Sequence, residues 1–335
     1  MSLVSTMGLP AIQDLQRKSF VAEAHRPGSA VRKIFHKETG DWAVDRKRVQ
    51  EMDVERFAET KLEGQASAQR GIAQGYAKEI VRKTISVENL VSGEAFKALT
   101  AHGLAKMATN VAKQIVDKIE LDMRNYLGIG TGTSYTDNAG FTIDTTTGDA
   151  LAVFYTAHTL KNSTTTYSNI LSGAPSLSED SLEDAEDYFN YSVRDNYGQP
   201  VGMKPNTLIT ANKAAMKNRA ARLLKSMSPE TVEGTANSNS GVNNTYKDKY
   251  EHLVIDFDQT AFGLPDTTKS FNWYLAALGG APEESFQAYY VSWTSPETSP
   301  VFVDQSRWTL SWVGRACYGI GAVSGKGVLI VQATY

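Results

Sequence analysis

The chain has 335 residues, with 34 Lys and Arg against 37 Asp and Glu, 41% hydrophobic residues and a single cysteine, Cys317. The near balance of charge argues against a dedicated nucleic-acid-binding protein, whose affinity depends on a basic surface, and against a protein of membrane surfaces. The length predicts two compact units, or one unit with long extensions. One cysteine excludes an internal disulfide and suits a reducing compartment.

The first residues are not expected to form a signal peptide, because they lack a basic segment followed by a long apolar core. No run approaches the roughly 18 apolar residues of a membrane span. Residues 1–35 contain the breaker pair Pro27-Gly28 and keep neither a helical nor a strand period, so they predict an extended arm. These features together indicate a soluble cytosolic protein.

Residues 36–90 predict a long excursion from the body, in the form of a hairpin. Its strands are expected around Trp42–Val44 and Ile80–Ile85, and the small residues of Gly64–Gly75 give a deformable connection. Such a segment, like the arm, is not expected to bury itself within one chain, so it would lie across neighbouring molecules.

A long amphipathic helix is the clearest predicted element. Ser92 is a good N-cap, Glu94 suits the first turn, and Gly128 ends the pattern. Apolar residues recur between them at three-, four- or five-residue steps. A helix over residues 94–127 would be about 50 Å long.

The rest of the chain predicts an α+β class. We expect a polar loop at 128–147, a strand at 150–155 and a helix capped by Ser178 with Leu182, Ala185, Phe189 and Val193 on one face. Further strands are expected at 206–211, 252–257, 272–278 and 288–293, with a basic helix at 212–226 and a polar loop at 228–247. The alternation at 307–320, the turn at 324–327 and the apolar run at 328–334 predict a closing β-hairpin.

The sequence offers one candidate base, His158, at the end of the expected strand at 150–155. A general base needs a nearby nucleophile and an orienting carboxylate. Cys317 is the sole thiol and lies in a strand among small residues, where a packed structural cysteine is expected. A structural role for His158 is therefore favoured, and no catalytic residue is predicted.

Neither a cofactor nor a metal site is predicted. The stretch "GIGTGT" at 128–133 follows a helix, whereas phosphate loops follow a strand, and "GKG" at 325–327 lacks the Ser or Thr after Lys. No histidines share zinc-ligand spacing, and the acidic run at 178–189 lacks the loop that calcium sites require. Both the acidic run and the basic helix, with Lys213, Lys217, Arg219, Arg222 and Lys225, are interpreted as solvated faces.

Several motifs in fixed order resemble one known family. They are "GYAKEIVRKTISVENLVSGEAF" leading into the long helix, "GDALAVFYTAH", "LSEDSLEDAEDYFNYSVRDNYGQPV", "PNTLITANKAAMKNRAARLLKS", "HLVIDFDQTAFGLPDTTKSFNWYLAA" and "WTLSWVGRACYGIGAVSGKGVLIVQAT". Over roughly residues 36–335 this order resembles the major capsid proteins of tailed bacteriophages with the Hong Kong 97 fold. Within that family the Mu-like major head subunits are the most similar group. The lysine–asparagine cross-link of one family member has no recognisable counterpart here.

The resemblance implies an arm (1–35), an extended loop (36–90), a peripheral domain with a long spine helix (91–148 and 300–335) and an axial domain (149–299). It implies a non-enzymatic subunit that self-assembles, through hexamers and pentamers, into an icosahedral shell around double-stranded DNA. The DNA would be held by non-specific contact. No scaffold-like segment precedes the arm, so a separate scaffolding protein is expected, together with portal and head-completion proteins. Assembly would take place in the host cytoplasm, and the product is the virion.

Candidate inter-subunit contacts follow from this reading: Arg17, Arg32, Trp42, Phe57, Arg70 and Tyr76. Deleting residues 1–34 is expected to leave a folded subunit that does not close shells. Three alternatives stay open at this stage: an encapsulin-like compartment that holds protein cargo, a hydrolase using His158, and a nucleic-acid-binding module.

Overall fold

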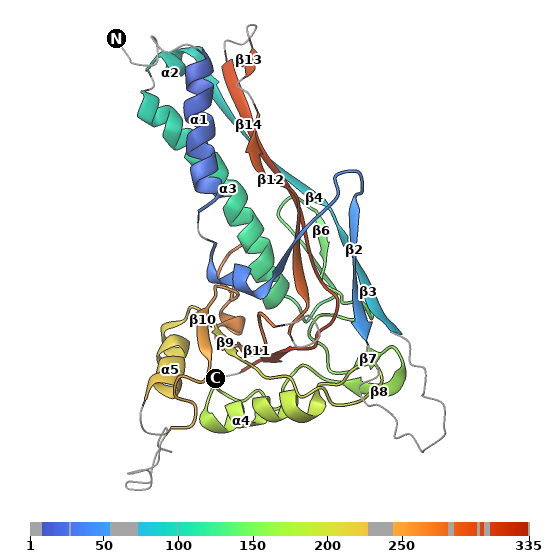
Figure 1. The fold of residues 1–335 in the computed structure, drawn as a ribbon. Helices are drawn as coiled ribbons and strands as arrows, with labels where there is room; N and C mark the ends of the chain where they lie inside the picture. Colours follow the sequence, from blue (N-terminus) through green and yellow to red (C-terminus); the bar gives the residue numbers. More distant parts are fainter. Residues whose placement is uncertain are drawn as a thin grey trace.

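The computed structural model describes residues 9–26, 28–53, 73–98, 100–226, 244–280, 285–299, 302–304 and 309–333. The predicted α+β class is confirmed. Figure 1 shows a narrow upper part, built from helices and long strands that run side by side, above a broader lower part with a second sheet. No helix in these ranges is both long enough and apolar enough to cross a membrane.

The upper part contains a five-stranded sheet centred on β14. Its strands are β1 (His36–Thr39), β4 (Lys83–Ser92), β12 (Ala288–Thr298), β13 (Phe302–Asp304) and β14 (Thr309–Ala322). β14 pairs antiparallel with β4, β12 and β13, and β1 adds parallel to β12. Every second residue of the first half of β14 is buried, from Leu310 to Ala316, which confirms the predicted alternation.

The long helix is divided into two. α2 (Gly93–Ala98) and α3 (Ala101–Gly128) replace the single helix expected at 94–127. Ser92 does cap the first, since its Oγ accepts from the Ala95 amide, but Thr100 caps a new helix by accepting from the Gly103 amide. A second good N-cap inside an apolar pattern restarts the helix, and α3 alone is about 42 Å long.

The core of the upper part lies between α3 and the sheet. Val111, Ile115 and Ile119 of α3 are at most 2% exposed. They meet β14 at Gly314, where an added Cβ would lie 2.5 Å from Val111 Cγ1 and 2.9 Å from Ile115 Cδ1. The missing side chain at Gly314 therefore allows the helix to approach the strand closely.

The prediction of an extended N-terminal arm is wrong. Residues Leu9–Ala24 form helix α1, and Ala30–Ile34 form the short 3₁₀ helix η2. Every fourth residue of α1 from Ile12 to Ala24 is buried, and the helix packs against α3. One of these four positions is Gln16, and the stripe is only one residue wide, so the sequence pattern was too faint to recognise.

The lower part contains a four-stranded sheet in the order β10-β9-β11-β15. Its strands are β9 (Thr207–Thr210), β10 (Glu251–Val254), β11 (Trp273–Ala276) and β15 (Val328–Val331), and α4 (Glu179–Asp187), η3 (Tyr188–Ser192), α5 (Ala214–Lys225) and η4 (Thr267–Lys269) accompany it. The helices at α4 and α5 and the strands at β9 to β12 are confirmed predictions. Ser178 caps α4, and all four residues of the predicted apolar face are buried, although Phe189 lies in η3 and Val193 follows it.

The predicted closing hairpin is wrong. β14 belongs to the upper sheet, whereas β15 pairs with β11 in the lower sheet. The chain changes sheet at Gly327, which has φ +80 and lies so close to Phe286 that an added Cβ would be 2.6 Å from its amide nitrogen. Two apolar strands beside a glycine turn cannot reveal by pattern alone that they serve different sheets.

Residues 150–155 form turns and one isolated bridge instead of the predicted strand. Ala150 has φ 64, which interrupts an extended conformation. His158 consequently begins strand β7 (His158–Leu160), which pairs with β8 (Ser163–Tyr167), and the polar loop before it contains a further hairpin, β5 (Ser134–Thr136) and β6 (Thr142–Asp144). The prediction that His158 ends a strand is therefore wrong.

The predicted hairpin in the extended loop is confirmed. β2 (Arg46–Asp53) and β3 (Ala73–Val81) are antiparallel, and β3 continues through Arg82 into β4. The strand expected at Trp42–Val44 is wrong, because these residues form a turn before β2. The connection between β2 and β3, most of the expected polar loop at 228–247, and the candidates Phe57 and Arg70 lie outside the described residues.

Candidate functional site

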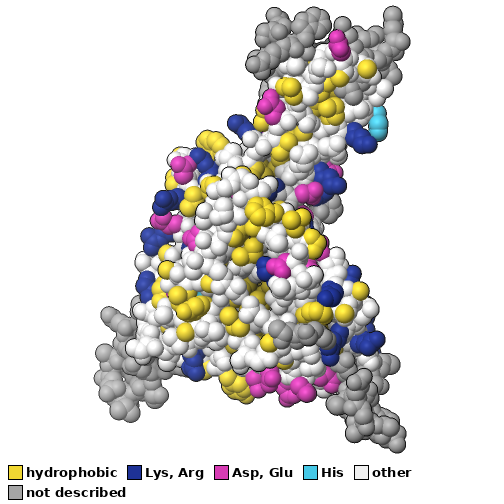
Figure 2. Space-filling model, turned by 180° about the vertical axis from the view of Figure 1, so that it is seen from behind, with side chains coloured by type: hydrophobic (Ala, Val, Ile, Leu, Met, Phe, Trp, Pro, Cys, Tyr) yellow, Lys and Arg dark blue, Asp and Glu magenta, His cyan; other side chains and the backbone are white. Residues whose placement is uncertain are grey.

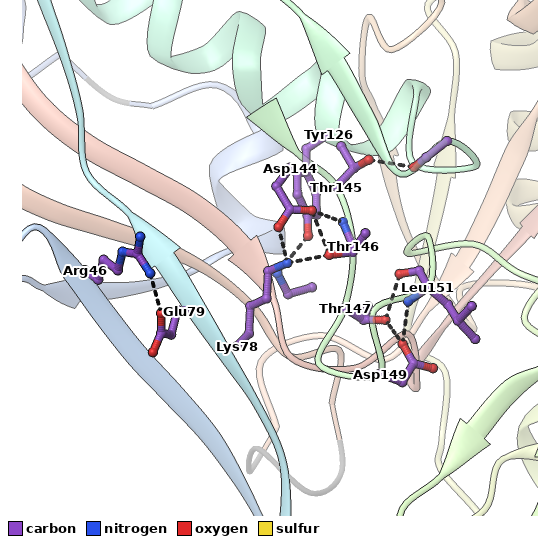
Figure 3. Close-up of polar contacts among 12 residues, drawn as sticks. Arg46, Lys78, Glu79, Tyr126, Asp144, Thr145, Thr146, Thr147, Asp149 and Leu151 are labelled. Atoms are coloured by element: carbon purple, nitrogen blue, oxygen red, sulfur yellow. Dashed lines mark hydrogen bonds and ion pairs between the residues drawn. The ribbon is translucent and has the colours of Figure 1, made fainter. Parts of the chain in front are cut away.

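The stem of the β2–β3 hairpin is fastened to the body by a buried lysine (Figure 3). Lys78 Nζ lies 2.5 Å from Asp144 Oδ2 and 2.6 Å from Thr146 Oγ1, and Lys78 is 8% exposed. Burial alone would raise the pKa of Asp144, but the hydrogen bonds from Lys78 and Thr146 lower it. On the outer face of the same hairpin, Arg46 of β2 and Glu79 of β3 form an exposed ion pair, with a nitrogen–oxygen distance of 3.0 Å. Because Lys78 is buried, its contacts are expected to fix the stem more strongly than the Arg46–Glu79 pair, in which both side chains are exposed.

A second buried cluster fastens the point where β3 becomes β4. Lys83 Nζ lies 3.1 Å from Asp122 Oδ2 of α3 and 2.5 Å from Asp137 Oδ2. Lys118 completes the cluster, with its Nζ 2.8 Å from Asp122 Oδ1 and 3.2 Å from Asp137 Oδ2. Burial would raise the pKa of Asp137, but hydrogen bonds from Lys83 and from the Phe141 amide hold it far below its usual range. Two cations and two anions therefore compensate each other inside the protein.

A third anchor joins β2 to the lower part of the molecule. Glu51 Oε1 accepts from Lys326 Nζ at 2.9 Å, and its Oε2 accepts from Asn196 Nδ2 at 3.0 Å. All three residues are at least nine-tenths buried. Gly75 of β3 allows this packing, because an added Cβ would lie 2.9 Å from the side-chain Nδ2 of Asn196 and 2.9 Å from Glu51 Cβ.

Two polar contacts hold the other edge of the hairpin. Lys161 Nζ donates to the Gly75 carbonyl oxygen at 2.9 Å, and the Tyr76 and Thr159 hydroxyls lie 3.0 Å apart. Together with α1 on α3, these contacts overturn the expectation that the arm and the hairpin cannot be held within one chain. For the described residues, both are packed on their own body.

Three apolar side chains at the base of the hairpin are exposed. Trp42, Val44 and Val81 are 56%, 49% and 52% exposed, and we call these three residues the hairpin-base patch. Arg82 holds the indole in place, since its guanidinium lies 4.7 Å from the ring centroid and donates to the Trp42 carbonyl oxygen at 3.1 Å. Trp293 Nε1 donates to the Val44 carbonyl oxygen at 2.9 Å, which fixes the backbone below. A rigid, exposed tryptophan beside an arginine is typical of an interaction surface.

The acidic and basic helices are surface features. Figure 2 shows acidic side chains at the lower edge of the molecule, where Figure 1 places α4, and hydrophobic side chains in a broken band across the middle of this face. The exposed acidic residues of α4 are Asp180, Glu183, Asp184 and Asp187. Among the described residues, no group of three or more His, Cys, Asp or Glu side chains is placed to hold a metal ion.

His158 is a buried structural residue. Its Nδ1 lies 2.8 Å from Asp149 Oδ2, its Nε2 lies 3.2 Å from the Val153 carbonyl oxygen, and its ring stacks on Tyr167. The orienting carboxylate that the sequence did not reveal is thus present, but the imidazole is 0% exposed. Cys317 is also buried, and its Sγ lies 3.3 Å from Thr84 Oγ1. It packs in a hydrophobic cluster with Ile80 and Trp293, which does not include His158.

The other predicted contact residues lie in different surroundings. Arg17 is exposed on α1. Arg32 Nε lies 3.1 Å from Glu120 Oε1 of α3, and Tyr76 is bonded to Thr159, so both have partners within their own chain. The sequence analysis missed Glu51, Lys78 and Lys326. A charged residue in a strand, as Glu51 and Lys78 are, or in a turn, as Lys326 is, gives no sign of its burial, because its partner is far away in the sequence.

No family model matches this sequence, and no curated protein matches it. Among solved structures, a chain of Microbacterium phage Oxtober96 is 10% identical, with a TM-score of 0.48 and coverage of 92% of both chains. A phage-related protein from Bordetella bronchiseptica RB50 is 14% identical, with a TM-score of 0.48 and coverage of 93% of this chain and 94% of that one. A virus-like particle from Pyrococcus furiosus is 11% identical, with a TM-score of 0.46 and coverage of 95% and 98%. This likeness is too distant to assign a family or a function.

Proposed function

We propose that this chain is a phage major capsid protein with the Hong Kong 97 fold, of the Mu-like group, which self-assembles into an icosahedral shell around double-stranded DNA. The observation that carries the proposal is the hairpin. Its stem is fixed by the buried lysines Lys78 and Lys83 and by the buried Glu51–Lys326 pair, and it leaves the exposed hairpin-base patch at its root. A rigid projection with an aromatic anchor serves contact between subunits better than it serves chemistry.

The proposed assembly follows from repetition of modest contacts. A projection on one side of a subunit and a receiving surface on another give head-to-tail contacts, which close into rings. Many such contacts in one shell reinforce each other through effective concentration. In this proposal the arm, extended loop, peripheral domain and axial domain have the bounds implied by the family resemblance. Hexamers and pentamers assemble in the host cytoplasm with scaffolding, portal and head-completion proteins, and the DNA is held without sequence-specific contacts.

The proposal is tested by expressing the chain and measuring particle formation. We expect particles in negative-stain images and in the void volume of a size-exclusion column. Trp42→Ala is expected to reduce their yield without changing the unfolding midpoint, because the side chain is exposed. Tyr191→Ala is the matched control, since Tyr191 is 69% exposed and lies on η3, which is not part of the hairpin. A wild-type chain that stays a single molecule at every concentration would contradict the shell function.

Two alternatives have separate readouts. An encapsulin-like shell would contain protein cargo instead of nucleic acid, so the nucleic-acid content of purified particles distinguishes it from a phage head. A hydrolase would lose activity on His158→Gln while it kept its assembly. The structure favours the opposite result, because His158 is buried and both its ring nitrogens face oxygens of the core.

A further inference from the structure

The segment between β10 and β11 presents two large apolar side chains to solvent. Phe262 and Leu264 are 59% and 62% exposed, among the highest values for hydrophobic residues in the described part of the chain. We call residues 258–266 the knob loop. In Figure 1 this segment lies beside the lower half of α3, whereas β6 and the hairpin stem lie on the other side of that helix.

The knob loop is rigid. The Thr260 amide donates to the Leu264 carbonyl oxygen at 2.7 Å, and the Asp266 amide donates to the Asp258 carbonyl oxygen at 2.8 Å. Gly263 supplies the positive φ of 78 that the turn needs. Asn125 Nδ2 of α3 donates to the Ala261 carbonyl oxygen at 3.1 Å, which ties the loop to the helix. Phe262 is therefore held outward at little further loss of conformational entropy on binding.

An apolar pocket lies at the hairpin stem. Its apolar lining residues are Ile80, Val81, Phe141, Ile143 and Ile320, and its volume is about 140 Å³. Charged side chains line it as well: Lys78, Glu79, Lys83, Asp122 and Asp144. Val81 and Phe141, which are 52% and 42% exposed, form its accessible rim. We call it the hairpin pocket. An apolar cavity of about 150 Å³ holds one benzene ring, so the hairpin pocket is the size of a single phenylalanine side chain.

The knob loop does not line the hairpin pocket of its own chain. The knob loop contacts α3 through Leu121 and Asn125, whereas the pocket uses the neighbouring Asp122, whose side chain faces Lys83. Phe262 also stays exposed instead of filling the pocket of its own chain. A second copy of the chain can supply a ring of this size, because each copy exposes its own Phe262.

We propose that Phe262 of one copy inserts its ring into the hairpin pocket of a second copy. Because the knob and the pocket are different surfaces, the contact is head-to-tail, and repetition closes it into a ring. The inference rests on the proposed shell function and names the contact by which the subunits associate. The ion pairs of the buried lysines Lys78 and Lys83, which themselves line the pocket, would keep its walls in place for the incoming ring.

Cysteine cross-linking tests this contact directly. Phe262→Cys and Val81→Cys are prepared separately, mixed under mild oxidation and examined for disulfide-linked dimers. The only native thiol, Cys317, is 2% exposed and gives little background. We expect dimers in the mixture and not with either variant alone. Tyr191→Cys mixed with Val81→Cys is the control, and a cross-link no stronger than this control would overturn the inference.

Association strength gives an independent measurement. Phe262→Ala is expected to weaken association about 30-fold, as for truncation of a hot-spot aromatic, with an unchanged unfolding midpoint. Val81→Trp, which fills the pocket from its exposed rim, is expected to weaken it similarly. Loss of association with Val81→Trp alone would assign the pocket to another occupant and overturn the inference.

The shell function and the knob contact fail in distinguishable ways. Normal particles from Phe262→Ala would overturn the contact and leave the shell function intact. Cross-linked rings without closed particles would support the contact and contradict the shell. A wild-type chain that never associates would overturn both.

Discussion

Glu51 and Lys326, 275 residues apart in the sequence, form a buried ion pair of 2.9 Å between strand β2 of the hairpin and the turn before β15. Asn196 Nδ2 donates a hydrogen bond to the second carboxylate oxygen, so both oxygens of Glu51 have partners. This pair connects the hairpin, the lower sheet and the turn at 195–199. It therefore sets the direction in which the hairpin leaves the body.

We expect Lys326→Met to destabilise the folded chain by about 3–5 kcal/mol, because it leaves the Glu51 carboxylate buried without its cation. The double variant Glu51→Gln/Lys326→Met should lose less, since no uncompensated charge is left inside. Urea unfolding of the two variants measures the difference. Hydrogen exchange of the β2 and β3 amides should show faster opening in Lys326→Met.

The control for this pair is Lys33→Ala. Lys33 pairs with Glu251 at 2.5 Å, but the two side chains are 60% and 55% exposed, so its removal should change the free energy of unfolding by at most about 1 kcal/mol. Equal losses for Lys33→Ala and Lys326→Met would show that burial of the Glu51 pair does not matter.

The cluster around Asp137 predicts a pH dependence. Its folded pKa is lowered, so its contribution to stability is complete above the unfolded pKa of about 3.9 and is lost as the pH falls towards the folded value. Asp137→Asn removes this contribution at every pH. We therefore expect the variant to be less stable than wild type at neutral pH and the difference to shrink below about pH 4.

Urea midpoints measured from neutral to acidic pH for both proteins check this sign. Asp184→Asn is the control, because Asp184 is exposed on α4 and the structure gives it no buried cation. A difference between wild type and Asp137→Asn that grew as the pH fell would contradict the cluster.

The fit of α3 on β14 predicts a strong effect at Gly314. Gly314→Ala would place a Cβ 2.5 Å from Val111 Cγ1 and 3.0 Å from Phe20 Cε2, and overpacking of this kind costs about 1–3 kcal/mol. Gly132→Ala is the matched control, since its nearest neighbours lie 3.6 Å or more away. Thermal unfolding of the two variants compares them, and equal midpoints would rule out the close approach.

Much of the fold could be predicted from local pattern. Periodicity or capping within a few residues predicts three elements: α5, α4 with its Ser178 cap, and the alternating β14. The split between α2 and α3 and the separation of β14 from β15 could not be predicted in this way. Both depend on what a segment packs against, and Gly327 looks the same in a hairpin turn as in a passage between sheets.

The candidate site was harder to predict than the fold. Trp42 is one of the predicted inter-subunit contact residues, and the structure shows it exposed and held by Arg82. Glu51, Lys78 and Lys326 carry no such signal, because charged residues in strands and turns are usually solvated and only tertiary structure places their partners. Helix α1 was missed for the related reason that its buried stripe includes Gln16.

The packing of α1 changes what is expected of the N-terminal deletion. Phe20, Val31 and Ile34 are 1–2% exposed in contact with the main core, so removal of residues 1–34 would uncover apolar surface of α3 and the upper sheet. Phe20→Ala alone should cost about 3–5 kcal/mol, and the deletion more than that. Arg17→Ala, on the exposed face of α1, is the control and should stay within about 0.5 kcal/mol of wild type. Urea unfolding of the three variants distinguishes a segment packed on α3 from an independent arm. A deletion variant with the wild-type midpoint would mean that residues 1–34 form an independent arm.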